Sequence, residues 1–190
     1  MKLLINHFIS SIEIHLKIHD QLVNMNPIFK RHSIRKYSDA EVTDEQIENL
    51  LKAGMQAPSA CNQQAWEFIV VKNEEDKKSI SEMHKFAKPA GEASRLIVVL
   101  GNLNEAKIES MIEQDLGACC ENILLQTTYE GLGAVWLGFH PIEDRSKKLM
   151  DYLKIPNNCI PFAVICIGYP ALESNPKMRF DESKVHFDKY

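Results

Sequence analysis

The sequence has 190 residues, of which 45% are hydrophobic and 25% are charged, and a chain of this size and composition folds as one globular domain with a substantial core. Its formal net charge is −4, so the molecule as a whole does not attract nucleic acid or an anionic membrane surface. The 5 cysteines include no C-x-x-C pair, and they therefore indicate reduced thiols in a cytoplasmic protein and neither a zinc site nor a disulfide framework.

The N-terminal stretch MKLLINHFISSIEIHLKIHDQLVN is interrupted by charged residues and histidines, which makes it too polar to span a bilayer. It also lacks the small-residue cleavage site of a secretory signal. We therefore expect residues 1–24 to be an extension that the chemistry does not need, and residues 25–190 to form the functional domain. Asn26 followed by Pro27 predicts a short helix at the start of that domain.

Residues 31–37 read RHSIRKY. In an extended backbone alternate side chains share a face, which would place four of these residues together: Arg31, Ser33, Arg35 and Tyr37. This pattern fits a solvated basic patch, and it also fits a site for an anionic group. The heptapeptide alone does not decide between the two interpretations.

A helix is predicted over residues 44–55, because Thr43 and Gln46 have the spacing of a capping box. Its predicted buried face consists of Ile47, Leu50, Leu51 and Gly54. The stretch APSACNQQA that follows contains Pro58 and a polar cluster, and such a composition is typical of a loop.

Four short apolar runs predict strands that are covered on both faces. They are WEFIVVK from Trp66, RLIVVLG from Arg95, GAVWLGF from Gly133 and PFAVICIGY from Pro161. Helical patterns lie between them, over residues 74–86, 108–130 and 143–153. This alternation predicts an α/β or α+β sandwich in which helices cover both faces of one sheet.

The segment 108–130 is apolar around much of the helix circumference, and Gly131 is placed to end it. Such a helix must be buried on several sides. In a domain of this size we expect it to pack on the sheet and against a second subunit.

Residues with cationic or hydrogen-bonding side chains gather in four places: 31–35, PSACNQQ at 58–64, WLGFHP at 136–141 and PKMRF at 176–180. Arginines of the first segment together with Lys177 and Arg179 would suit a phosphate group. Ser59, Asn62 and Gln63 could hydrogen-bond the edge of a planar heterocycle. Gly138 would let such a ring approach the backbone closely.

These motifs, in this order, resemble the FMN-dependent nitroreductase family. The resemblance rests on RHSIRKY, APSACNQQAWEFIVV, DLGACCENILLQTTYEGLGAVWLGFHP and PKMRFDESKVHFDKY, and it extends from about Pro27 to Tyr190. It implies a mostly antiparallel central sheet flanked by helices, and a homodimer with FMN at the subunit interface. It also implies that the C-terminal segment reaches the partner subunit.

The resemblance implies that each flavin is held by two subunits. One subunit would contribute Arg31, His32, Ser33, Arg35, Trp136, Leu137, Gly138 and Arg179. The other would contribute Pro58, Ser59, Ala60 and Asn62. Gln63 and Lys177, identified above by their chemistry, complete the set of expected cofactor-binding residues.

The activity implied is the reduction of nitroaromatic, quinone or other electron-poor acceptors by a ping-pong hydride mechanism, with NAD(P)H as a transient co-substrate. FMN would carry the chemistry, so no catalytic side chain is expected. Two alternatives remain open: a flavin-dependent dehalogenase or flavin-fragmenting enzyme of the same fold, and a redox-silent protein that binds or stores FMN.

Two positions depart from the family's pattern. Ala65 stands before Trp66 where proline is common, which leaves the loop without a fixed φ angle. Cys61 lies within the flavin-loop motif, where we expect a packed bystander thiol.

Other candidate residues lack the context that chemistry requires. The histidines lack metal-ligand spacing. Asp115 is expected to be a structural carboxylate in the first turn of the long helix or an interfacial one, and not a general base. The stretch GLGAVWLG is not a dinucleotide fingerprint, because its third glycine is misplaced and it lacks the strand-to-helix context of that motif.

Overall fold

The computed structural model describes residues 26–172 and 176–190. The chain divides into two units, residues 31–173 and a terminal unit made of residues 1–30 and 174–190. The predicted extension 1–24 lies outside the described residues. Among the described residues, none of the helices combines the length and the apolar composition needed to cross a bilayer.

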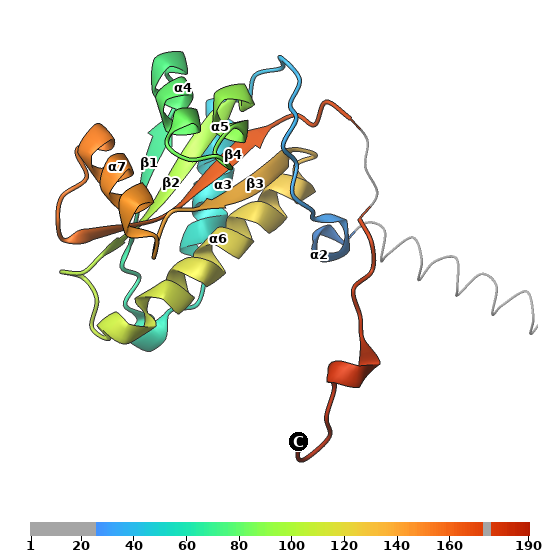
Figure 1. Ribbon diagram of the computed structural model, residues 1–190. Coiled ribbons are helices and arrows are strands. Elements are labelled where there is room, and N and C mark those ends of the chain that lie inside the picture. The colour runs from blue at the N-terminus through green and yellow to red at the C-terminus, as the bar shows by residue number, and fades with distance from the viewer. Residues whose placement is uncertain (1–25, 173–175) are drawn as a thin grey trace, which may run out of the picture. The chain divides into compact units, whose positions relative to one another are not determined.

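The larger unit is built on a four-stranded sheet (Figure 1). Its strands are β1 (Trp66–Val71), β2 (Arg95–Asn102), β3 (Gly133–Gly138) and β4 (Cys159–Gly168). The spatial order is β1-β2-β4-β3, and every neighbouring pair is antiparallel. The four predicted strands and the antiparallel sheet are therefore confirmed. β1 is less covered than expected, since it lies at the sheet edge and most of its apolar side chains are only half-buried.

One face of the sheet packs against α3 (Asp44–Met55) and α6 (Ile112–Tyr129). The predicted capping box is present, since Thr43 Oγ1 accepts from the Gln46 N–H at 3.1 Å and Gln46 Oε1 accepts from the Thr43 N–H at 3.0 Å. The two helices approach closely at Gly54, where an added Cβ would lie 2.9 Å from Ile123. The predicted α3 face is buried, with Leu51 only half-buried.

The opposite face packs against α4 (Glu74–Glu82), α5 (Pro89–Glu92) and α7 (Glu143–Leu153). The prediction of one helix over 74–86 is wrong, because α4 ends at Glu82 and the chain turns before α5. This turn brings Ala87 and Ala90 into the core, where neither has any exposed surface. Both faces of the sheet therefore carry helices, as predicted.

The long helix α6 begins later than the predicted residue 108. A short 3₁₀ turn, η2 (Glu109–Met111), precedes it. Ile108 lies outside the helix, since its φ of −130° and ψ of 87° are not helical. The side-chain amide of Gln63 contacts it there, binding its N–H at 2.9 Å and its carbonyl at 3.4 Å. At the other end the chain leaves the helix through Gly131, whose φ of 73° is the left-handed conformation expected there.

Residues 31–37 run along the free edge of β3. The backbone forms isolated bridges from Ser33 to Ala134 and from Tyr37 to Pro170. The predicted shared face is wrong for Tyr37, which turns inward while Arg35 stays exposed. Its ring packs over Gly168, where an added Cβ would lie 2.7 Å from it. The Tyr37 hydroxyl donates to the Ile34 carbonyl at 2.7 Å, and burial raises the pKa of this phenol.

The terminal unit contains α2 (Pro27–Lys30) and the 3₁₀ turn η3 (Glu182–Lys184). The predicted cap of α2 is present, since Asn26 Oδ1 accepts from the Ile28 N–H at 2.9 Å. Residues 177–190 are exposed throughout. That this segment reaches a partner subunit stays a prediction.

Candidate functional site

A pocket of about 500 Å³ lies beside β3 in the larger unit. Its walls come from the 31–37 segment, the loop between α4 and α5, β3 itself and the start of α7. Four predicted site residues line it, although they are far apart in the sequence: Arg35, Trp136, Leu137 and Gly138. The structure therefore brings together two of the four segments that the sequence singled out.

The pocket is strongly cationic, and we call it the basic pocket. Five basic residues line it: Arg35, Lys36, Lys85, Lys88 and Arg145. One carboxylate, that of Glu92, faces them, and it lies 3.5 Å from the Lys36 ammonium. In a chain of net charge −4, this local clustering creates the positive potential that an anionic ligand needs.

Backbone groups of β3 form one wall of the basic pocket. On the outer edge of the strand, the Ala134 carbonyl accepts from the Ile34 N–H at 2.9 Å, and alternation places the backbone groups of Trp136 and Gly138 on the same edge. The Gly138 carbonyl accepts from Arg145 Nη1 at 3.1 Å. A Cβ added to Gly138 would meet nothing within 4 Å, so a ligand has room to approach the main chain there.

His84 fixes the loop between α4 and α5. Its ring lies edge-on to Phe139, with centroids 5.1 Å apart, and its Nδ1 accepts from the Phe86 N–H at 3.3 Å. This bond requires the tautomer that carries the proton on Nε2, and Nε2 is buried without a hydrogen-bond partner among the described residues. Burial lowers the pKa of His84, and the charges of Arg145 and Lys148 lower it further. His84 is therefore a neutral structural imidazole in the pocket wall.

Sequence reasoning missed this wall. His84, Lys85, Phe86 and Lys88 fell within or just beyond a predicted helix, and Arg145 lay in another. The closely spaced basic residues of HKFAK at 84–88 were the one available signal, and such runs are common on solvated helix faces.

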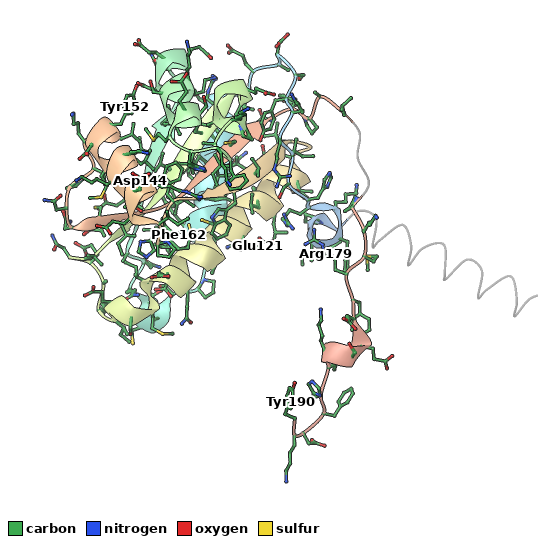
Figure 2. All side chains as sticks on the ribbon, in the orientation of Figure 1. Glu121, Asp144, Tyr152, Phe162, Arg179 and Tyr190 are labelled. Atoms are coloured by element: carbon green, nitrogen blue, oxygen red, sulfur yellow. The ribbon has the colours of Figure 1, made fainter. Side chains whose placement is uncertain are left out.

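The other members of RHSIRKY lie outside the lining of the basic pocket. Arg31 pairs with Glu121 of α6, with Nε and Oε1 3.3 Å apart; Figure 2 labels Glu121. Ser33 is exposed and His32 is half-buried. The predicted role of these three residues in cofactor binding stays a prediction.

The predicted flavin loop 58–64 also lies outside this lining. It contains the 3₁₀ turn η1 (Ala60–Asn62), and left-handed backbone occurs at Cys61, Asn62 and Gln64, with φ of 49°, 50° and 51°. Pro58 and Asn62 are exposed, and Ser59 and Ala60 are half-buried. That the loop serves the site of a second subunit stays a prediction.

Asp115 and Gln63 anchor that loop to α6. Asp115 Oδ1 accepts from the Ala60 N–H at 2.9 Å, and Oδ2 accepts from Gln63 Nε2 at 2.5 Å. Gln63 is 7% exposed and also binds Ile108. The structural role expected for Asp115 fits these contacts, whereas Gln63 has no side-chain donor left for a ligand.

Lys177 and Arg179 belong to the terminal unit, where both are exposed; Figure 2 labels Arg179. Their predicted contribution to a phosphate site stays a prediction.

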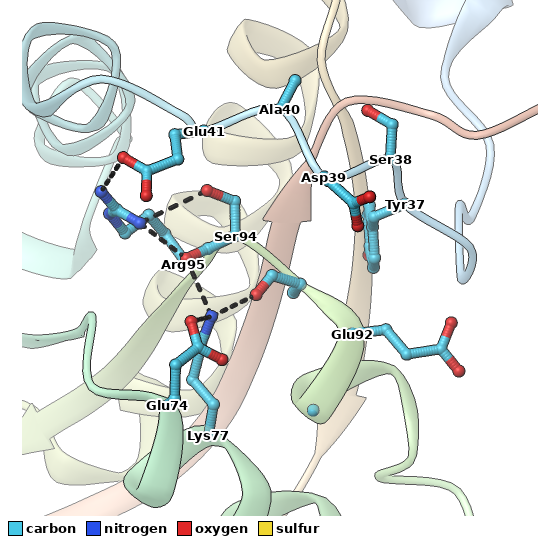
Figure 3. A pocket seen from close by; sticks show the side chains of 12 residues that line it. Tyr37, Ser38, Asp39, Ala40, Glu41, Glu74, Lys77, Glu92, Ser94 and Arg95 are labelled. Atoms are coloured by element: carbon cyan, nitrogen blue, oxygen red, sulfur yellow. Dashed lines mark hydrogen bonds and ion pairs between the residues drawn. The ribbon is translucent and has the colours of Figure 1, made fainter.

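A second pocket, of about 450 Å³, lies near α5 (Figure 3). Its buried Lys77 donates to the Ala93 carbonyl at 2.7 Å and pairs with Glu74 at 2.7 Å. Arg95 donates to the Ser94 carbonyl at 2.9 Å. Both cations thus bind protein oxygens around the end of α5, so this polar network holds the helix in place.

No group of three or more histidine, cysteine or acidic side chains placed to hold a metal ion occurs within residues 26–172 and 176–190. His140 lies in contact with Glu113, with Nε2 and Oε1 2.9 Å apart.

Comparisons with known proteins agree with this architecture. The chain matches the model of the nitroreductase family over residues 28–99 and 86–169. It is 43% identical over 167 residues to a protein of Archaeoglobus fulgidus provisionally named NADH dehydrogenase/NAD(P)H nitroreductase, covering 86% of this chain and 96% of that one.

Two solved structures show the same fold. A provisionally named NADH oxidase of Clostridium acetobutylicum has a TM-score of 0.84 and 46% identity, over 86% of this chain and 99% of that one. An FMN-dependent nitroreductase of Clostridium difficile has a TM-score of 0.81 and 28% identity, over 87% of this chain and 99% of that one. The chain therefore belongs to the nitroreductase family.

Proposed function

We propose that this protein is an NAD(P)H-dependent FMN oxidoreductase that reduces electron-poor acceptors such as nitroaromatics and quinones. One observation carries the proposal: the basic pocket joins an exposed arginine, Arg35, to an open backbone edge at Gly138. The first feature suits the phosphate of a mononucleotide and the second suits a flat ring. Family membership and the name of the Clostridium difficile relative support the same cofactor.

The residues present fit FMN. The Arg35 guanidinium has no ion-pair partner among the described residues, so its forked donors are available to phosphate oxygens. The missing side chain of Gly138 leaves room for a ring against the strand. The volume of the basic pocket, about 500 Å³, lies in the range of small-molecule sites.

We place the complete site at the interface of a homodimer. The loop 58–64 carries the remaining predicted contacts, and its exposed Asn62 lies outside the lining of the basic pocket of its own chain. A second copy of the chain would bring its loop to that pocket. Lys177 and Arg179 of the C-terminal segment would add positive charge for the phosphate. The Arg31–Glu121 pair would then stiffen the start of the 31–37 segment.

When bound, FMN supplies the redox chemistry, accepting a hydride from NAD(P)H and passing electrons to the acceptor. The chain itself binds and orients. Arg35 anchors the anionic end, the β3 edge offers backbone hydrogen-bond donors, and Arg145 holds the Gly138 carbonyl so that this edge keeps its shape. No side-chain acid is assigned, because His84 is held neutral and buried at Nε2 and Asp115 is occupied by the loop.

The cysteines support a reducing, cytoplasmic setting. All five are free, and burial raises the pKa of Cys119 to about 12 and also raises that of Cys166. These two thiols are inert packing groups. Cys61 is exposed, so the expectation that it would be packed is wrong.

The test is steady-state turnover. The protein loaded with FMN should oxidise NADH or NADPH in proportion to added nitroaromatic or quinone, and the protein without FMN should not. Retention of FMN without any turnover would favour the redox-silent storage protein.

A further inference from the structure

We propose that the outer rim of the basic pocket, formed by Lys85, Phe86 and Arg145, is a subsite for an electron acceptor that carries an anionic group on a planar ring. The inference rests on the proposed function and names the class of acceptor: aromatic carboxylates and sulfonates in preference to neutral analogues.

Phe86 gives this rim its affinity for a ring. It lines the basic pocket, yet 60% of its surface is exposed. Two cations lie over its ring: Lys85 Nζ is 4.8 Å and Arg145 Cζ is 6.0 Å from the ring centroid. An aromatic surface with positive charge beside it matches a planar ring that bears an anionic substituent.

The rim is rigid, as a specificity element must be. The Phe86 N–H is held by His84 Nδ1, and the Ala87 N–H donates to the His84 carbonyl at 2.9 Å. Ala87 is fully buried, and Pro89 starts α5 directly afterwards. On the other side, Arg145 is fixed by its bond to the Gly138 carbonyl. The exposed ring is thus presented by a buried, hydrogen-bonded loop.

Neither cation of the rim forms an ion pair with a described residue, although Arg145 donates to the Gly138 carbonyl. Within residues 26–172 and 176–190, neither Lys85 nor Lys88 forms an ion pair, whereas Lys36 has Glu92. Arg35, the proposed phosphate ligand, lies on a different segment from the α4–α5 loop. A compact anion directly on a ring suits Lys85, because its ammonium lies within 4.8 Å of the Phe86 centroid. In a dinucleotide, a ribose separates the ring from the phosphate.

The experiment compares para-nitrobenzoate with its neutral analogue para-nitrobenzamide. For the FMN-loaded protein, kcat/KM at fixed NADH should be higher for the carboxylate. At saturating FMN, Lys85→Glu should lower the ratio of the carboxylate's kcat/KM to that of the amide by about tenfold, since a like charge now faces the anion. Phe86→Ala should lower both kcat/KM values. Lys78→Glu is the matched control, because Lys78 is exposed on α4 and does not line the basic pocket.

A binding measurement separates this subsite from the proposed function. Titration calorimetry of the two compounds into the oxidised protein, without NADH, should show tighter binding of the carboxylate in wild type and no preference in Lys85→Glu. Equal affinities in wild type would overturn the subsite even if turnover with NADH were normal. A Lys85→Glu defect confined to the KM of NADH would also overturn it, by assigning the rim to the coenzyme. Absence of turnover with a preserved binding preference would overturn the redox function alone.

Discussion

The carboxylate Oδ1 of Asp115 accepts a hydrogen bond from the main-chain N–H of Ala60 at 2.9 Å. This contact joins the buried start of α6 to the exposed loop 58–64, and Gln63 reinforces it from the same loop. The loop is therefore held in a defined conformation before any second subunit or ligand is added.

Asp115→Ala should destabilise the protein without directly affecting the chemistry. It removes the acceptor of the half-buried Ala60 N–H and one of the two acceptors of the Gln63 amide, and an unsatisfied buried donor costs about 1 to 3 kcal/mol. We expect a loss of about 2 to 4 kcal/mol in the free energy of unfolding, measured by denaturant titration. Asp115→Asn keeps one acceptor and should lose about half as much. A folded Asp115→Asn protein that binds FMN but is not reduced by NADH would contradict the structural role.

Arg35→Ala should weaken FMN much more than riboflavin. Arg35 is exposed in the basic pocket, and the loss of one charge-assisted hydrogen bond to phosphate costs about 1.5 to 3 kcal/mol. Riboflavin lacks the phosphate, so its affinity should hardly change. Flavin fluorescence titrations measure both, with Lys147→Ala, an exposed cation of α7 outside this pocket, as control. Equal losses for the two flavins would remove Arg35 from the phosphate site.

Much of this architecture follows from local sequence signals. Thr43 and Gln46 define the start of α3, and the four β-rich runs become the four strands, because capping and apolar patterning act over a few residues. The pocket wall was not predictable in this way. The turn after Glu82 depends on His84 meeting Phe139, and the place of Arg145 depends on Gly138; both are contacts between segments that are distant in the sequence.

The orientation of Tyr37 was also not predictable from local sequence, because it depends on a contact with a distant segment. Alternation in an extended chain predicts that it shares a face with Arg35, but its burial over Gly168 overrides that pattern. The order of the motifs grouped Arg35 with Gly138, and both line the basic pocket. It could not reveal that Arg31 is paired with Glu121.

Mixing two inactive variants tests the shared site. If each flavin needs Arg35 from one chain and Asn62 from the other, Arg35→Ala and Asn62→Ala homodimers are each defective at both sites. In a heterodimer of the two variants, both substitutions fall in one FMN site and the other FMN site has only wild-type residues, because the interface is isologous. About half of the wild-type FMN occupancy should return in tagged, purified heterodimers. No recovery despite confirmed subunit exchange would place both residues in the same site.

His84 should make stability depend on pH. Its pKa in the folded protein lies below the ordinary value of 6.5, so the unfolded chain takes up the proton first as the pH falls. The stabilisation that comes from burying a neutral His84 is fully present well above pH 6.5. It is lost as the pH falls from that value through the pKa of His84 in the folded protein. His84→Asn keeps an acceptor for the Phe86 N–H but does not titrate. On acidification from neutral pH, the melting temperature of wild type should fall more steeply than that of the variant; parallel curves would contradict a depressed pKa.

Anaerobic reduction of the bound flavin is the decisive experiment for the proposed redox function. The purified protein, loaded with FMN, is mixed with NADH or NADPH in the absence of oxygen, and the visible absorbance of the flavin is followed. We expect at least one coenzyme to bleach the flavin absorbance rapidly. The absorbance should recover when a quinone or nitroaromatic is added. A flavin that stays bound and oxidised in the presence of both coenzymes would contradict it.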